Sequence, residues 1–185
     1  MRIAATMTTL RDNPTNPRWL RKALREIPRE IGRIVEGFDD RMLHWRSAPG
    51  EWSALEVLGW IAEAEREDLL AVEAMIRYDG AAIWEQRAHL ASLERDFNQE
   101  SGWRLLDDFL STREQLQWML EYVDDQWQHR GEHPYRGAIT LAKYLREMSD
   151  RDLEATIMLR RLADGADADF EPVLRERTTV VPIAP

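Results

Sequence analysis

Residues 53–78, SALEVLGWIAEAEREDLLAVEAMIRY, decide the fold. Apolar side chains recur in this stretch every three or four residues, which is the spacing of one face of an α-helix. Ser53 followed three residues later by Glu56 is a capping-box pattern, so we expect a helix over about 54–78. Its stripe is Leu55, Leu58, Ala62, Glu65, Leu69, Val72 and Ile76, in which every member except Glu65 is apolar.

The stretch before it predicts a first helix with the same periodicity. Residues 17–36 carry one apolar stripe, and Gly37 is a suitable residue to end the helix. Pro28 lies in the middle of the stripe, where it removes a backbone hydrogen bond and clashes with the preceding turn, so we expect a kink or a break there. Residues 39–52, with Pro49-Gly50, are expected to form a loop.

Two more helices follow. Residues 101–127 have apolar side chains at helical spacing, and so do residues 140–163, where Thr140 can act as the N-cap. Gly165 is expected to stop the last helix. The stripe of that helix is Leu141, Leu145, Met148, Asp152, Ala155, Leu159 and Leu162, with Asp152 as its single polar member.

Four such helices predict an all-α protein, an antiparallel four-helix bundle with a long connection between the second and third helices. Residues 1–16 are expected to form an N-terminal arm and residues 17–165 the bundle. Residues 166–185 are expected to form a C-terminal tail that packs either on its own bundle or on a partner subunit. The long connection, residues 80–100, is expected to carry a short helix outside the bundle.

Composition limits the function. The formal net charge is −9 and the basic residues alternate with acidic ones, which argues against nucleic acid and against an anionic membrane surface as partners. The chain has no cysteine and no apolar run of about 20 residues, so disulfides, thiolate metal sites and a membrane span are not expected. A cytoplasmic protein is the expectation.

Two stretches carry a family resemblance. They are WRSAPGEWSALEVLGWIAEAE, residues 45–65, and DDQWQHRGEHPYRGAITLAKYLREMSDRDLEATIMLRRL, residues 124–162. Both resemble the DinB-like (YfiT-like) superfamily of bacterial four-helix-bundle metalloproteins. In that family one histidine on the second helix and two on the last helix bind a divalent metal, commonly zinc or nickel. Some members use the metal for thiol S-transferase, isomerase or hydrolase chemistry.

The three histidine positions of the family carry other residues here. The first falls at Trp60, and the second and third fall at Arg151 and Ala155, or at Glu147 and Arg151 in an alternative register. Trp and Ala offer no ligand atom, and Arg brings a positive charge that repels a metal ion. The resemblance therefore implies a vestigial metal site at Trp60, Glu147, Arg151 and Ala155, and we expect no cofactor.

Several readings of this region remain open. Arg151 can take the place of the missing cation and pair with Glu65 or Glu147 in a buried polar network that also includes Asp152, or it can point to solvent. Glu65 and Asp152 can also be read as substitute ligands for a divalent metal such as zinc or nickel. The chain's histidines fall in expected loops or in the irregular stretch after helix two, and they are His44, His89, His129 and His133.

The preferred functional reading is a metal-free, non-catalytic binding or interaction protein of the family, expected to form a homodimer and able to bind a small apolar ligand near Trp60. The alternative is a metal-dependent thiol S-transferase or hydrolase-type enzyme with substitute carboxylate ligands. The sequence names neither a substrate nor a pathway.

Overall fold

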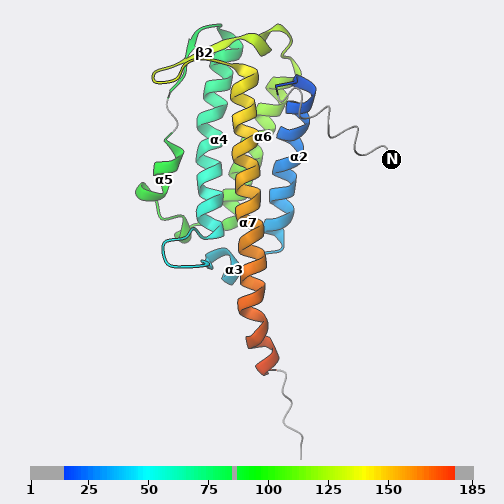
Figure 1. Ribbon diagram of the computed structural model, residues 1–185, viewed down its shortest axis with the longest axis vertical. Coiled ribbons are helices and arrows are strands. Elements are labelled where there is room, and N and C mark those ends of the chain that lie inside the picture. Colours follow the sequence, from blue (N-terminus) through cyan, green and yellow to red (C-terminus); the bar gives the residue numbers. More distant parts are fainter. Residues whose placement is uncertain (1–14, 85–86, 178–185) are drawn as a thin grey trace, which may run out of the picture.

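Four long helices lie side by side in the computed structural model, which describes residues 15–84 and 87–177 (Figure 1). They are α2 (Pro17–Glu36), α4 (Ala54–Arg77), α6 (Gly102–Glu121) and α7 (Leu141–Arg177). Each helix contacts two others, in the cyclic order α2, α7, α4, α6. The predicted four-helix bundle is confirmed.

The long connection after α4 sets the direction of the helices. It starts at the end of the bundle where the sheet lies, passes through α5 (Ala88–Glu94) and η1 (Phe97–Gln99), and returns the chain to the opposite end (Figure 1). Consequently α4 and α6 are neighbours that run in the same direction, and so are α2 and α7. The antiparallel contacts are those of α4 with α7 and of α2 with α6.

The helix starts follow from capping residues. The Asn16 side chain accepts hydrogen bonds from the backbone N–H groups of Arg18 and Trp19 at the start of α2. Ser53 and Glu56 form the predicted capping box, with Ser53 Oγ accepting from Glu56 N and Glu56 Oε2 accepting from Ser53 N. These bonds satisfy N–H groups that have no partner within the helix.

Pro28 does not break α2, which corrects the expectation of a break. Pro28 has no N–H, so the carbonyl of Leu24, four residues earlier, lacks its usual helical donor. That carbonyl instead accepts hydrogen bonds from Arg113 Nη1 at 3.1 Å and Gln117 Nε2 at 3.2 Å, both from α6. The backbone group that proline leaves open is therefore satisfied by a neighbouring helix.

Short elements occupy regions that the sequence analysis assigned to loops. The predicted loop 39–52 contains the helix α3 (Asp40–His44), with Asp39 as its N-cap. A three-stranded sheet, which was not predicted, covers one end of the bundle; its strands are β1 (Ala81–Ala82), β2 (Arg130–His133) and β3 (Gly137–Thr140). The predicted third helix is shorter than expected, because α6 ends at Glu121 and Trp127 lies in the 3-10 helix η2 (Asp125–Gln128).

Gly165 does not stop the last helix, which continues to Arg177 beyond the rest of the bundle (Figure 1). A Cβ atom at Gly165 would lie 2.6 Å from the ring of Trp45, so the glycine provides space for close packing. The boundary expected at residue 165 therefore does not coincide with a helix end. The predicted arm and the apolar end of the tail fall largely outside the described residues, and so does any test of how the tail packs.

The core consists of two apolar clusters, one above the other along the bundle axis. The cluster nearer the sheet includes Leu20, Leu24, Val72, Leu116 and Leu145. The cluster at the opposite end includes Ile31, Leu58, Phe109, Ala155 and Leu159. On α4, α6 and α7, buried charged residues lie along the chain between members of the two clusters. Within the described residues, no helix is long and apolar enough to cross a membrane.

Candidate functional site

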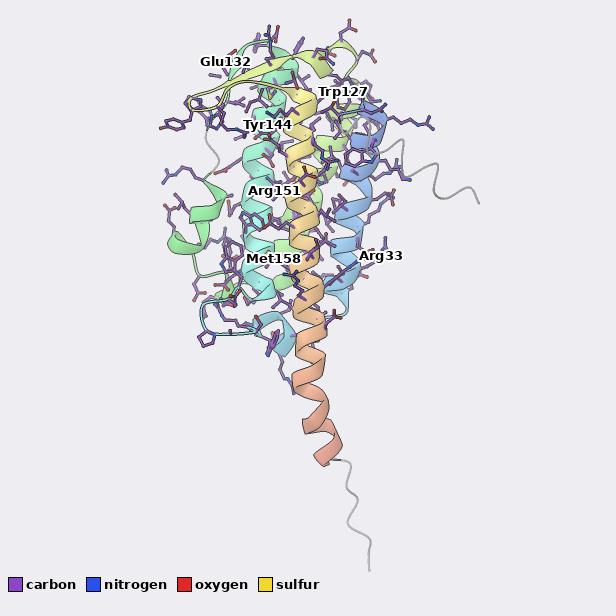
Figure 2. All side chains as sticks on the ribbon, in the orientation of Figure 1. Arg33, Trp127, Glu132, Tyr144, Arg151 and Met158 are labelled. Atoms are coloured by element: carbon purple, nitrogen blue, oxygen red, sulfur yellow. The ribbon has the colours of Figure 1, made fainter. Side chains whose placement is uncertain are left out.

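A buried ion network lies between the two apolar clusters. We use the name ion network for Glu65 and Asp68 on α4, Arg113 on α6, and Arg151 and Asp152 on α7. Figure 2 shows Arg151 on the part of α7 that packs in the bundle, between Tyr144 toward the sheet and Met158 toward the other end. The network contains three carboxylates and two guanidinium groups.

Arg113 lies at the centre of the network and is 1% exposed. Its Nε and Nη2 atoms donate to the two carboxylate oxygens of Glu65, each at 2.6 Å, which is the bidentate geometry of a strong arginine–carboxylate pair. Nη2 also lies 2.8 Å from Asp152 Oδ2. With Nη1 bound to the Leu24 carbonyl, the guanidinium connects α6 to the other three helices.

Arg151 lies at the edge of the network. Its Nη1 is 2.5 Å from Asp68 Oδ2, and its Nη2 is 3.6 Å from both Glu65 Oε2 and Asp152 Oδ1. The hydroxyl of Tyr144 donates to the other oxygen of Asp68 at 2.8 Å. Asp68 therefore pairs with Arg151 inside the network and accepts a hydrogen bond from Tyr144 outside it.

Burial and charge act in opposite directions on these groups. Burial raises the pKa of Glu65 because it disfavours the ionised carboxylate, and the neighbouring Arg113 only partly opposes that rise. Burial alone would lower the pKa of Arg113, but the carboxylates of Asp152 and Glu65 outweigh it and raise that pKa. The same balance, with Asp68 as the main partner, raises the pKa of Arg151. Both arginines are therefore cations in the folded protein.

The network residues do not fit a divalent metal. Two fixed guanidinium groups already lie against the three carboxylates, and each would repel an added cation. Among the residues that the structure describes, no group of three or more His, Asp or Glu side chains has the arrangement of a metal site. The substitute-ligand reading of Glu65 and Asp152 therefore lacks support from the geometry, because Arg113 lies between these two carboxylates.

A cleft of about 350 Å³ opens beside Arg151, between α7, α4 and the turn that joins β2 to β3. Asp68 and Arg151 form its inner wall, and the pair of Arg136 with Glu147, 2.6 Å apart, lies on its rim. Aromatic side chains and one thioether provide the rest of the lining: Trp84, His133, Tyr135, Tyr144 and Met148. The cleft thus combines aromatic rings with two charged members of the ion network, Asp68 and Arg151.

The four predicted vestigial positions separate in the structure. Only Arg151 belongs to the ion network. Glu147 pairs with Arg136 and not, as the sequence reading allowed, with Arg151. Ala155 is buried in the cluster at the far end. Trp60 packs edge-on against Trp52, with ring centroids 5.5 Å apart.

Trp60 also borders a second cavity of about 350 Å³, together with Gly50, Trp52 and Met158. The small apolar ligand expected from the sequence would lie near Trp60. The cavity there is more open than the cleft beside Arg151, and the ion network does not reach it. The cleft beside Arg151 therefore offers a ligand more charged groups than the cavity at Trp60 does.

The histidines expected in loops bond to backbone groups, and two of them end short elements: His44 ends α3 and His133 ends β2. His44 bonds the carbonyls of Asp40 and Asn98, and His129 Nδ1 lies 2.9 Å from the carbonyl of Met75. His133 Nδ1 accepts from the N–H groups of residues 135 and 136 in the β2–β3 turn. The side chain of His89 lies outside the described residues.

Two members of the network, Arg113 and Asp68, were not predicted from the sequence. Arg113 lies three residues after Leu110 and three before Leu116, so it interrupts the apolar stripe of α6. The same signal singled out Glu65 on α4 and Asp152 on α7. Applied to every helix, it would have identified Arg113, whereas Asp68 lies beside the predicted stripe of α4 and gave no such signal.

The comparisons with known proteins agree with the fold. Residues 23–150 match the family model of the DinB superfamily. A similar solved structure is that of YfiT from Bacillus subtilis, described as "a probable metal-dependent hydrolase with an unusual four-helix bundle topology". The two chains are 18% identical, with a TM-score of 0.66 over 80% of this chain and 87% of YfiT. No curated protein matches the sequence.

Proposed function

The chain belongs to the DinB superfamily, and we propose that it is a metal-independent member that binds a small organic molecule in the cleft beside Arg151, without catalysing a reaction on it. The observation that carries the proposal is the position of Arg113 and Arg151. Their two guanidinium groups lie among three buried carboxylates, in the bundle interior where a member with a metal centre would need neutral or anionic ligands.

Electrostatic repulsion between cations supports the metal-independent part of the proposal. Two unit charges of the same sign about 4 Å apart repel by about 4 kcal/mol at an effective dielectric constant of about 20. A divalent ion among these carboxylates would meet that repulsion from each arginine, with twice the charge. Displacing either arginine would leave a buried guanidinium without its partners, which is costly as well.

The shape and lining of the cleft support the other part of the proposal, that the protein binds a small organic molecule. Small-molecule sites are concave and mostly apolar, with a few polar groups that fix the orientation of the ligand. A volume of about 350 Å³ lies at the lower end of the usual range and suits a compact molecule. The rings of Trp84, Tyr135 and Tyr144 supply apolar surface, while Asp68 and Glu147 supply charge.

The metal-independent part is tested on protein purified without an affinity tag that binds metals. Elemental analysis is expected to find far less than one equivalent of zinc, nickel or manganese per chain. EDTA is expected to leave the melting temperature unchanged. A metal bound at about 100 times its Kd would stabilise the fold by about 2.7 kcal/mol, so its removal would lower the melting temperature by about 5 °C or more.

Stoichiometric metal whose removal lowers the melting temperature would refute the proposal in favour of a metal-dependent hydrolase or S-transferase. The homodimer expected from the sequence stays a prediction; light scattering on the same sample measures it directly.

A further inference from the structure

The charges in and around the cleft do not balance. Glu65, Asp68 and Asp152 carry three negative charges when all three are ionised, and Arg113 and Arg151 carry two positive ones. The rim pair of Arg136 with Glu147 adds one of each. The described groups of the network and the cleft therefore have one negative charge in excess when all are ionised. The four charged residues that line the cleft balance one another, so the excess lies with Glu65 and Asp152, which are buried behind its inner wall.

Both arginines of the cleft are already committed to carboxylates. Arg151 Nη1 lies against Asp68, and Arg136 Nη2 lies against Glu147. Among the residues that the structure describes, none accepts a hydrogen bond from Nε or Nη2 of Arg151. Both atoms are buried, so an anion in the cleft would not reach them without a rearrangement. The arginines therefore do not make the cleft a ready site for an anion.

His133 is counted as neutral in this balance, as in the formal net charge of the chain. Its Nδ1 accepts hydrogen bonds from the backbone N–H groups of Tyr135 and Arg136, at 3.2 and 3.3 Å, so this nitrogen already has partners within the β2–β3 turn. Trp84 and Tyr135 are each 79% exposed and border the cleft. Faces of such rings attract cations, and most strongly where water is partly excluded.

Resting on the small-molecule function proposed above, we infer that the ligand of the cleft is an organic monocation: a protonated amine or quaternary ammonium group on a compact apolar body. The cationic group would lie near Asp68 and Glu147, and the apolar body against Trp84 and Tyr135. One positive charge offsets the one negative charge in excess. A compact body fits a volume of about 350 Å³.

Three probes of similar size and different charge test this inference on the full chain. They are phenethylamine, phenethyl alcohol and phenylacetate, titrated at about pH 7.5 and followed by NMR of backbone and tryptophan indole N–H groups. Phenethylamine is expected to bind about tenfold more tightly than the other two, a difference of about 1.4 kcal/mol. The shifted signals are expected to include those of Trp84 and Arg151.

Matched variants locate the binding. Trp84→Leu is expected to weaken phenethylamine about threefold to tenfold through the lost cation–π contact, whereas Trp118→Leu, an exposed tryptophan on α6, is expected to leave it unchanged. Glu147→Gln is expected to weaken it about threefold, and Glu114→Gln, beside Trp118, to have no effect. Both cleft substitutions lie at solvent-accessible positions, so we expect both variants to fold.

The outcomes separate the two proposals. Phenylacetate or phenethyl alcohol binding in the cleft as tightly as phenethylamine would overturn the inference of a cation and leave the small-molecule function standing. Equal effects of Trp84→Leu and Trp118→Leu would overturn the assignment to this cleft. Failure of all three probes to bind would count against both the cation and the small-molecule function.

Discussion

Replacing Arg113 by methionine removes the central cation of the ion network and keeps a long, flexible side chain in its place. The variant loses two charge-assisted hydrogen bonds to Glu65, each of which contributes about 1.5–3 kcal/mol to stability. The variant also loses the hydrogen bond from Arg113 to the Leu24 carbonyl. This loss adds little, because the carbonyl keeps the hydrogen bond from Gln117. Removing one partner of a buried ion pair typically costs about 3–5 kcal/mol, and we expect a loss in that range.

Urea denaturation, followed by circular dichroism and tryptophan fluorescence, measures the free energy of unfolding of Arg113→Met. The matched double variant, Arg113→Met with Glu65→Met, removes both members of the bidentate pair. We expect it to recover at least half of the lost free energy, because apolar side chains of similar volume can replace a buried ion pair at little or no cost. A loss below about 1 kcal/mol in the single variant would refute the central role of Arg113.

The pH dependence of the same variant provides a second check. Burial already raises the pKa of Glu65 above its usual value, and loss of the opposing guanidinium raises it further. A carboxyl with a raised pKa in the folded state binds more protons folded than unfolded, so stability falls as pH rises through the interval between the two pKa values. Relative to the parent protein, the cost of Arg113→Met should therefore shrink as pH falls toward the usual pKa of glutamate; a cost that grows there would contradict this reasoning.

Two further substitutions test the packing and the capping by urea denaturation. Gly59→Ala would place a Cβ atom 2.3 Å from the ring of Phe97, so we expect it to lower the free energy of unfolding by about 1–3 kcal/mol although alanine favours a helix. Gly32→Ala is the control, because its Cβ would meet its nearest atom at 3.9 Å; we expect it to raise the free energy of unfolding by up to about 1 kcal/mol. Equal effects would argue against the close contact at Gly59. Ser53→Ala removes a capping box and should cost about 1 kcal/mol, whereas Ser101→Ala, at an N-cap whose side chain makes no capping bond, should change stability little.

Long-range periodicity made most of the fold predictable. Helices of 20 residues or more repeat their apolar spacing several times, and α2, α4 and α6 begin within a residue of the predicted positions. The strands of two to four residues are too short to show a period of their own. The helix end predicted at Gly165 was wrong, because a glycine that leaves space for a neighbouring ring looks the same in the sequence as a glycine that ends a helix.

The candidate site was predictable only in part. A charged residue in an apolar stripe shows that a helix buries a charge, and this identified Glu65 and Asp152. It does not show which charge of another helix lies opposite, because that depends on how the helices are aligned along the axis. Arg151 was predicted as a candidate from its place in the family pattern, but its main partner in the network, Asp68, was not predicted.

The carbonyl of Leu24 connects two positions that are distant in the sequence. Because Pro28 cannot donate to it, this oxygen is free to orient the guanidinium of Arg113, which in turn faces Glu65. An ordinary residue in place of Pro28 would supply its own N–H and compete with Arg113 for the same acceptor. The backbone of one helix thus limits which side chains can change independently on another, and Pro28 and Arg113 should be treated as a single unit when this bundle is redesigned.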